Sequence, residues 1–179
     1  MYTIDKEFNW EMGHRVWSQK LDSKYSIDNL CKCRFYHGHG YRAKIGLKTE
    51  SLKNGMVTDF KHFNFIKEII DNYFDHKFMI DKNDPNLNMV FPQYKNLEGI
   101  SYDGFFEYFK APQNSTELEK EHIEAFVVVD FVPTSENICK MLYKLIHFKM
   151  QDLLKVEGCC MAFVELWETP KSHCRYTND

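Results

Sequence analysis

CKCRFYHGHGYRAKIGLKT, residues 31–49, is the stretch of this chain that decides the fold. From residue 39 onward apolar and polar side chains alternate, which predicts a strand over residues 39–49 with one apolar face. That face carries Tyr41, Ala43, Ile45 and Leu47. His37 and His39 stand two residues apart at its start. Both imidazoles therefore point to the same side, because side chains alternate along an extended strand.

A third imidazole on a neighbouring strand would complete a metal site. Residues 2–12 also alternate well enough for a strand, and His14 follows them. Together His14, His37 and His39 would hold a metal and leave one coordination position open, which suits zinc catalysis better than structural zinc. Cys33 lies four residues before His37. A cysteine beside such a metal can lose its proton and act as a base or nucleophile.

The same stretch also allows a closed zinc site in a non-catalytic binding domain. Its four ligands would be Cys31, Cys33, His37 and His39. The short C-x-C and H-x-H spacings lack the usual spacers of zinc fingers, which counts against this hypothesis. The two hypotheses differ on His14, which only the three-imidazole site needs.

Length and composition exclude several classes of protein. A chain of 179 residues predicts a single domain, residues 1–179. The net charge of −3 and the scattered basic residues give no footprint for nucleic acid. No apolar run is long enough to span a membrane, and the first residues lack the order of a signal peptide. Six irregularly spaced cysteines favour free thiols, so we expect the protein to be cytoplasmic.

Two stretches predict helices. Asp59 can cap a helix from about Phe60 to Phe74. Its predicted buried stripe is Phe63, Ile66, Ile70 and Phe74. Thr134 or Ser135 can cap a second helix, with Glu136 in its first turn. The predicted apolar face of that helix carries Ile138, Met141, Leu142, Leu145 and Phe148.

The remaining elements define the fold class. Cys159–Trp167 predicts a buried strand and His173–Thr177 a short last one. Residues 83–132 form an irregular, hairpin-like excursion, with extended pieces expected around Leu87–Tyr94 and Ala125–Val132. The order strand, strand, helix, excursion, helix, strand, strand predicts an α+β layer, with an antiparallel sheet and helices on one face.

Three further candidates have an ordinary structural explanation as well as a functional one. Asp75-His76 can form an acid/base pair in which the carboxylate holds the imidazole tautomer, or simply end a helix. Glu168, at the end of an apolar strand, can accept two parallel hydrogen bonds from a flat heterocycle, or lie exposed. Thr134-Ser135-Glu136 is fully adequate as a helix start.

Read together, these segments resemble the 6-pyruvoyl-tetrahydropterin synthase family, which includes 6-carboxy-tetrahydropterin synthase. Six motifs in order carry the resemblance over nearly the whole chain. They are F-x-x-x-G-H-R (Phe8 to Arg15), K-C-x-x-x-H-G-H (Lys32 to His39), G-M-V-x-D-F (Gly55 to Phe60), D-H (Asp75, His76), P-T-S-E-N (Pro133 to Asn137) and W-E-T (Trp167 to Thr169).

The resemblance implies a fold and an assembly. The fold would be the T-fold, or tunnelling fold, a four-stranded antiparallel sheet with two helices on one face. The excursion at about 83–132 would be an insertion before the second helix. Family members are typically hexamers made of two trimers, with sites between subunits, so a homo-oligomer is expected.

The resemblance also implies a role for each candidate. His14, His37 and His39 would bind zinc, and Cys33, Asp75 and His76 would transfer protons. Glu168 would anchor the pterin ring, assisted by Thr134, Ser135 and Glu136.

The implied substrate is a small molecule, 7,8-dihydroneopterin triphosphate. The gap between Cys33 and His37 is similar to that of the carboxy-forming enzymes of the queuosine pathway. Cys31 stands at the longer gap of the pyruvoyl-forming enzymes, but Lys32-Cys33 fits the lysine-cysteine dipeptide of the motif. The resemblance therefore favours Cys33 and a zinc-dependent, carboxy-forming reaction with loss of triphosphate and acetaldehyde, and the pyruvoyl product is the alternative. Arg15 is a candidate for binding the triphosphate.

Overall fold

The structure, a computed structural model, describes residues 1–27, 30–97 and 100–178. Its strands are β1 (Tyr2–His14), β2 (His37–Thr49), β3 (Lys77–Asp81), β4 (Ile100–Tyr102), β5 (Glu107–Phe109), β6 (Phe126–Val129), β7 (Cys160–Thr169) and β8 (Ser172–Tyr176). Its helices are α1 (Asn64–Tyr73), α2 (Leu87–Val90), α3 (Glu117–Glu124) and α4 (Ser135–Glu157), with short 3-10 turns η1 (Lys32–Arg34), η2 (Phe60–Phe63) and η3 (Pro92–Lys95).

The chain forms two compact units. Unit 1 comprises Met1–Trp10, Gly40–Asn72 and Ser135–Asp179. Unit 2 comprises Glu11–His39 and Tyr73–Thr134. The strand order is β4-β5-β6-β3-β1-β2-β7-β8, and β1 and β2 contribute residues to both units. The expectation of a single domain stays a prediction.

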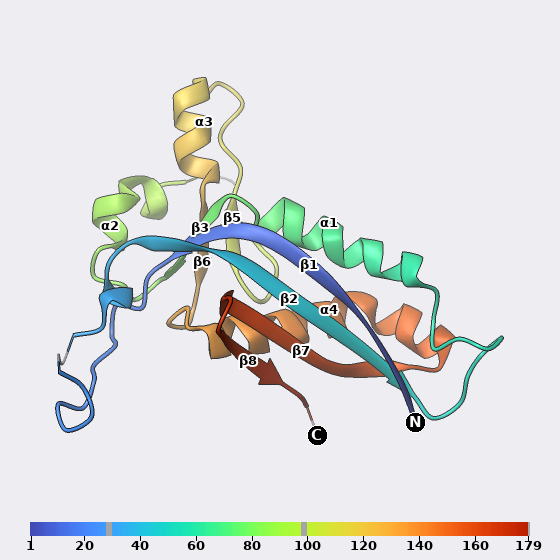
Figure 1. Ribbon diagram of the computed structural model, residues 1–179. Coiled ribbons are helices and arrows are strands. Elements are labelled where there is room, and N and C mark those ends of the chain that lie inside the picture. Colours follow the sequence, from blue (N-terminus) through green and yellow to red (C-terminus); the bar gives the residue numbers. More distant parts are fainter. Residues whose placement is uncertain (28–29, 98–99, 179) are drawn as a thin grey trace. The chain divides into compact units, whose positions relative to one another are not determined.

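Unit 1 contains the strands expected from alternation. β2 pairs with β7, and β7 with β8, in antiparallel fashion. Ala43 lies opposite Leu166 and Ile45 opposite Val164, and these four side chains are fully buried. The apolar face of β2 is therefore core, as predicted. Helix α4 packs on β7 and β8 (Figure 1).

The first predicted helix is confirmed with a modified start. Asp59 caps the 3-10 turn η2, its side chain accepting a hydrogen bond from the Lys61 N–H at 2.8 Å, and α1 follows. The four residues of the predicted stripe are at most 1% exposed.

Helix α4 begins at Ser135, as predicted, but its apolar face differs at one position. Phe148 is 52% exposed, whereas the other four predicted residues are buried. The buried stripe continues through Ile146, Met150 and Leu154 at a spacing of four residues. Phe148 lies two residues from Ile146 and from Met150, which is roughly half a turn in a helix of 3.6 residues per turn. Its side chain therefore points away from the core.

Unit 2 contains four strands beyond the expected four-stranded sheet, and of these only β6 had been predicted as an extended piece. β3 pairs in parallel with the end of β1 and with β6, while β5 pairs antiparallel with β6 and β4 with β5. The prediction of an α+β class is confirmed. The parallel pairs were not predicted; they need long crossover connections, which α1 and the excursion supply.

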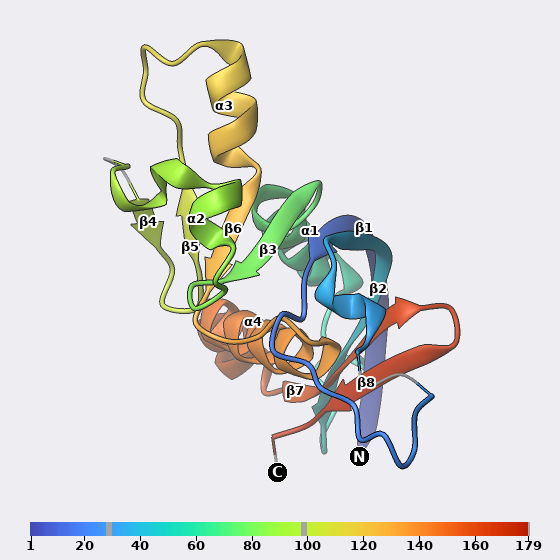
Figure 2. The same cartoon turned by 90° about the vertical axis from the view of Figure 1, so that its left-hand side faces the viewer.

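The excursion contains the helices α2 and α3 and the 3-10 turn η3 besides the strands β4, β5 and β6 (Figure 2). The prediction around Leu87–Tyr94 is wrong, since α2 and η3 occupy it. Leu87 and Phe91 share one helical face at a spacing of four residues and are buried in a core with Phe109, Phe126 and Val128. The second extended piece is confirmed as β6. No helix among the described residues is long and apolar enough to cross a membrane.

Candidate metal centre

The three histidines singled out by the sequence lie together in unit 2. His14 ends β1, and His37 and His39 begin the neighbouring strand β2. Their ring centroids are 4.5 Å (His14–His37), 5.2 Å (His14–His39) and 4.9 Å (His37–His39) apart. One ligand nitrogen from each histidine lies within 4.8 Å of the other two, so the cluster could hold a metal ion.

Backbone carbonyls prepare two of these imidazoles for a metal. His14 Nδ1 lies 2.7 Å from the Pro133 oxygen, and His37 Nδ1 lies 2.8 Å from the Phe35 oxygen. A carbonyl only accepts hydrogen bonds, so in each ring Nδ1 carries the proton and Nε2 keeps its lone pair. The Nε2 atoms of all three histidines are buried. Three imidazoles that gather their Nε2 atoms, two of them with the tautomer fixed by a carbonyl, fit a transition-metal ion.

The closed four-ligand site is disfavoured. Within the described residues, the group of side chains placed to bind a metal contains the three histidines and neither Cys31 nor Cys33. Neither Cys31 nor Cys33 forms a disulfide, and both are half-buried. Cys33 lies in η1, where its carbonyl accepts a hydrogen bond from the Val16 N–H at 2.8 Å. Its role in proton transfer stays a prediction.

Asp75 and His76 form the expected pair before β3. His76 Nδ1 lies 3.0 Å from Asp75 Oδ1, and the same oxygen accepts a hydrogen bond from the Glu11 N–H at 3.0 Å. The backbone N–H of His76 donates a hydrogen bond to the backbone carbonyl of Glu11 at 2.7 Å. His76 has a φ of 58°, a left-handed conformation that is uncommon outside glycine and recurs at functional sites. With Nδ1–H directed at Asp75, Nε2 of this mostly exposed ring can exchange protons.

A shallow pocket of about 370 Å³ lies next to the histidine cluster and the Asp75–His76 pair and is lined by one residue of each. Both His39 and His76 line it. Its other lining residues are Glu11, Met12, Gly13, Gly38, Lys77, Phe78 and Ala125, from β1, β2, β3 and the start of β6. One histidine of the candidate metal centre and the imidazole of the Asp75–His76 pair therefore border one pocket of a size that admits a small molecule.

The predicted pterin-binding residues lie at or near the ends of β7 and α4. Glu168 is half-buried in unit 1 and lies at a register irregularity between Trp167 and Thr169, where β7 pairs with β8. Such irregularities re-aim side chains and occur beside active sites. Ser135 and Glu136 open α4 in unit 1, and Thr134 ends unit 2. Their role in binding stays a prediction.

Two groups that orient the histidines could not be predicted from the sequence. The Pro133 and Phe35 carbonyls belong to the backbone, so residue type does not reveal them. Glycine is required at position 13 because a Cβ there would lie 2.4 Å from the Phe78 ring.

Arg15 was a candidate for binding triphosphate, but its guanidinium is buried beside Asp84.

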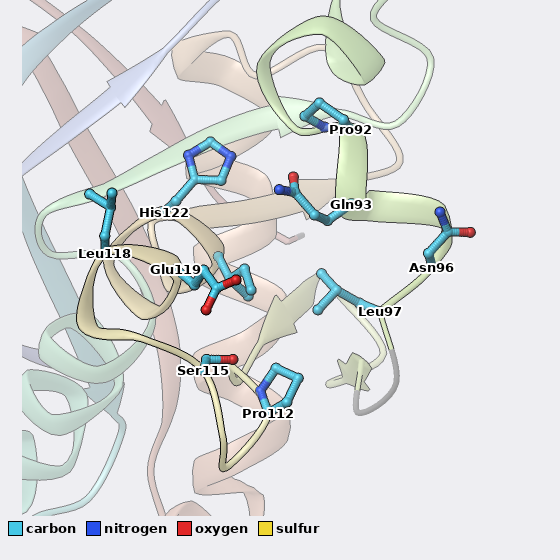
Figure 3. Close-up of a pocket in the computed structure, with 10 residues that line it drawn as sticks. Pro92, Gln93, Asn96, Leu97, Pro112, Ser115, Leu118, Glu119 and His122 are labelled. Carbon is cyan, nitrogen blue, oxygen red and sulfur yellow. The ribbon is translucent and has the colours of Figure 1, made fainter.

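A second pocket lies apart from the centre, in the excursion. It has a volume of about 580 Å³ and lies between η3 and α3 (Figure 3). Gln93, Asn96 and Leu97 line one side, and Leu118, Glu119 and His122 the other. None of its lining residues belongs to the histidine cluster or the Asp75–His76 pair.

Comparisons with known proteins define first the class and then the family. The structure of Caenorhabditis elegans 6-pyruvoyl tetrahydropterin synthase is 20% identical with a TM-score of 0.58, and the match covers 99% of this chain and 96% of that one. The T-fold is thereby confirmed, although the sheet has more strands than predicted. A family profile described as 6-pyruvoyl tetrahydropterin synthase matches residues 3–179, and the chain belongs to that family.

Two further relatives match over nearly their full lengths. The 6-carboxy-5,6,7,8-tetrahydropterin synthase of Aquifex aeolicus is 28% identical over 185 residues, covering 99% of both proteins. The crystal structure of an uncharacterized protein from Wolinella succinogenes is 37% identical with a TM-score of 0.88, covering 99% of this chain and 98% of that one. The family and the Aquifex aeolicus relative support a tetrahydropterin synthase, an enzyme that acts on a pterin.

Proposed function

We propose that the protein is a zinc-dependent 6-carboxy-5,6,7,8-tetrahydropterin synthase of the queuosine pathway. It converts 7,8-dihydroneopterin triphosphate and one water molecule to 6-carboxytetrahydropterin with release of triphosphate and acetaldehyde, which makes it a lyase. The observation that carries the proposal is the cluster of His14, His37 and His39 in a chain of this family. The full-length match to the Aquifex aeolicus enzyme favours the carboxy product.

The residues divide the chemistry between binding and proton transfer. Zinc held by the three histidines would lower the pKa of substrate side-chain hydroxyls and so polarise the neighbouring carbon–hydrogen bonds. Cys33, as a thiolate, takes and returns protons at the side chain and ring carbons. Asp75 holds Nδ1–H of His76, so Nε2 acts as the complementary acid or base (3.0 Å contact).

Recognition of the pterin is assigned to a carboxylate. Glu168 accepts hydrogen bonds from the amino group and the adjacent ring N–H, a donor pair that suits one carboxylate. Thr134, Ser135 and Glu136 assist it. The reaction is placed in the cytoplasm, and the assembly is a hexamer of identical chains. None of the six cysteines, all of which lie in the described part of the chain, forms a disulfide, which agrees with a reducing compartment.

The second candidate is 6-pyruvoyl-tetrahydropterin synthase, which stops after elimination of triphosphate. One observation favours it: Cys31 stands six residues before His37, the longer gap of the pyruvoyl-forming branch. A non-catalytic zinc domain is disfavoured because neither cysteine joins the histidine cluster among the described residues.

Metal removal tests the proposal. Chelator-treated protein is incubated with 7,8-dihydroneopterin triphosphate, and released inorganic triphosphate is measured before and after adding one equivalent of zinc. We expect no release without metal and recovery with zinc. Equal release by the stripped and the reconstituted protein would contradict zinc dependence.

A further inference from the structure

Arg15 is a buried cation with two defined partners. Its side chain is 9% exposed, and Nε lies 3.1 Å from Oδ2 of Asp84, whose side chain is fully buried. A terminal guanidinium nitrogen donates to the Tyr36 hydroxyl at 3.2 Å, and the guanidinium carbon lies 5.1 Å from the centre of the Tyr36 ring. A buried charge persists only where it is paired, so the Asp84 carboxylate fixes the guanidinium in place.

The two partners connect this cation to the candidate metal centre. Arg15 directly follows His14, and Tyr36 directly precedes His37. The contact between Arg15 and Tyr36 therefore links the residue after His14, at the end of β1, to the residue before His37, at the start of β2. The two imidazole centroids are 4.5 Å apart, so a small shift of either strand end would change the spacing of their nitrogens.

The next two residues extend the same set of contacts. The Val16 N–H donates to the Cys33 carbonyl at 2.8 Å, and Trp17 Nε1 donates to Asp81 Oδ2 at 2.9 Å. Asp81 is 2% exposed. Residues 15 to 17, which follow β1, thus contact in turn the turn that carries Asp84, the 3-10 turn η1 that carries Cys33, and Asp81 at the end of β3.

The loop that supplies Asp84 is itself ordered by short-range contacts. Asp81 Oδ1 accepts from the Asn83 N–H at 2.8 Å, and Asp84 Oδ1 accepts from the Asn86 N–H at 2.8 Å. The Asp84 N–H donates to the Asp81 carbonyl at 2.9 Å. Asp84 therefore presents its second oxygen to Arg15 from a preorganised turn.

We propose that Arg15, held by Asp84, is a positioning residue for the metal centre. It fixes the ends of β1 and β2 so that the His14 and His37 nitrogens stay at ligand spacing. The inference rests on the proposed function in one respect, namely that the centre binds zinc. It excludes a direct role for Arg15 in binding triphosphate, because an anion would have to displace a buried carboxylate to reach the guanidinium.

Zinc affinity of defined variants tests this proposal. The zinc dissociation constant is measured by competition with a chelator of known affinity. Arg15→Met removes the charge and both contacts, and Asp84→Asn removes the partner's charge at constant shape. Each should weaken zinc binding roughly 10–100-fold, the usual effect of losing an outer-shell partner. As a matched control, Tyr94→Phe removes the Tyr94–Glu107 hydrogen bond (2.8 Å) in the same unit and should leave zinc affinity unchanged.

Two further variants guard against simple unfolding. Tyr36→Phe deletes one hydroxyl from a side chain that is 45% exposed, so the fold should persist, with a smaller but measurable loss of zinc affinity. The double variant Arg15→Met/Asp84→Asn should bind zinc no more weakly than the more affected of the two single variants. The two losses of affinity should not add, because the two residues act as one pair. Wild-type zinc affinity in both Tyr36→Phe and Asp84→Asn, or additive losses in the double variant, would overturn the proposal.

A parallel measurement separates positioning from phosphate binding. Inorganic triphosphate is titrated into wild type and Arg15→Met, both saturated with zinc. Equal affinities are expected, whereas a loss confined to triphosphate would assign Arg15 to the substrate instead. Wild-type protein that bound no zinc would overturn the proposed zinc function and this inference together. Wild-type zinc binding with unaffected variants would overturn the inference alone.

Discussion

His37 shows how a single residue is prepared for metal binding. Its position two residues before His39 is visible in the sequence and sets the shared direction of the two rings. Its tautomer is set by the Phe35 carbonyl, 2.8 Å from Nδ1. In the same way, the tautomer of His14 is set by the Pro133 carbonyl, 2.7 Å from its Nδ1. Side-chain type provides the ligand, and the folded backbone determines which nitrogen is offered.

The choice of cysteine is the first prediction at this scale. Cys33→Ala should abolish turnover while zinc content stays near that of wild type, because the thiol transfers protons and is not a ligand. Cys31→Ala is the matched control two residues away and should keep most activity. Turnover and zinc content of the two variants are measured side by side. The reverse pattern would assign the reaction to Cys31 and favour the pyruvoyl product.

Glu168→Gln tests pterin recognition. The amide keeps the shape but presents a donor where the pterin requires an acceptor, so pterin binding should weaken by roughly 2–4 kcal/mol. Glu165→Gln on the same strand is the control, since the Glu165 carboxylate is already paired with Arg175 at 3.0 Å. Isothermal titration with a pterin gives both affinities. Near-normal binding by Glu168→Gln would mean that the pterin lies elsewhere.

At the scale of elements, the pairing of β1 with β3 depends on one small residue. Gly13 lies opposite Phe78 in the parallel register, and a Cβ at residue 13 would lie 2.4 Å from Phe78 Cδ2. Gly13→Ala should therefore lower the free energy of unfolding by about 1–3 kcal/mol through overpacking. Gly13→Ala/Phe78→Val should recover part of that loss in urea titrations. A fully stable single variant would show that the strands separate at little cost.

The end of α4 gives a pH-dependent prediction. Hydrogen bonds from Lys53, and then from Thr58, lower the pKa of the Glu157 carboxyl below its ordinary value of 4.5. A lowered folded-state pKa contributes stability that is present above pH 4.5 and is lost as the pH falls through the lowered pKa. Glu157→Gln should thus destabilise the protein at pH 7 and less so at pH 3. An equal difference at both pH values, measured by thermal unfolding, would refute this.

At the scale of the whole molecule, the sequence predicted the regular parts and missed what depends on long-range packing. Alternation along residues 39–49 and the stripe of Phe63, Ile66, Ile70 and Phe74 were sufficient for the elements of unit 1. The excursion was misread because its polar residues conceal the helical spacing of Leu87 and Phe91. The Arg15–Asp84 pair was not predictable, since its members are 69 positions apart and meet only after folding.

The reaction product is the most direct test of the central claim, that this member of the 6-pyruvoyl tetrahydropterin synthase family is a carboxy-forming enzyme. Zinc-loaded protein is incubated with 7,8-dihydroneopterin triphosphate, and the products are identified by mass spectrometry. The account predicts 6-carboxytetrahydropterin with equimolar triphosphate and acetaldehyde, and no product from a variant with alanine at His14, His37 and His39. Accumulation of 6-pyruvoyl-tetrahydropterin without acetaldehyde, or an unconsumed substrate, would contradict it.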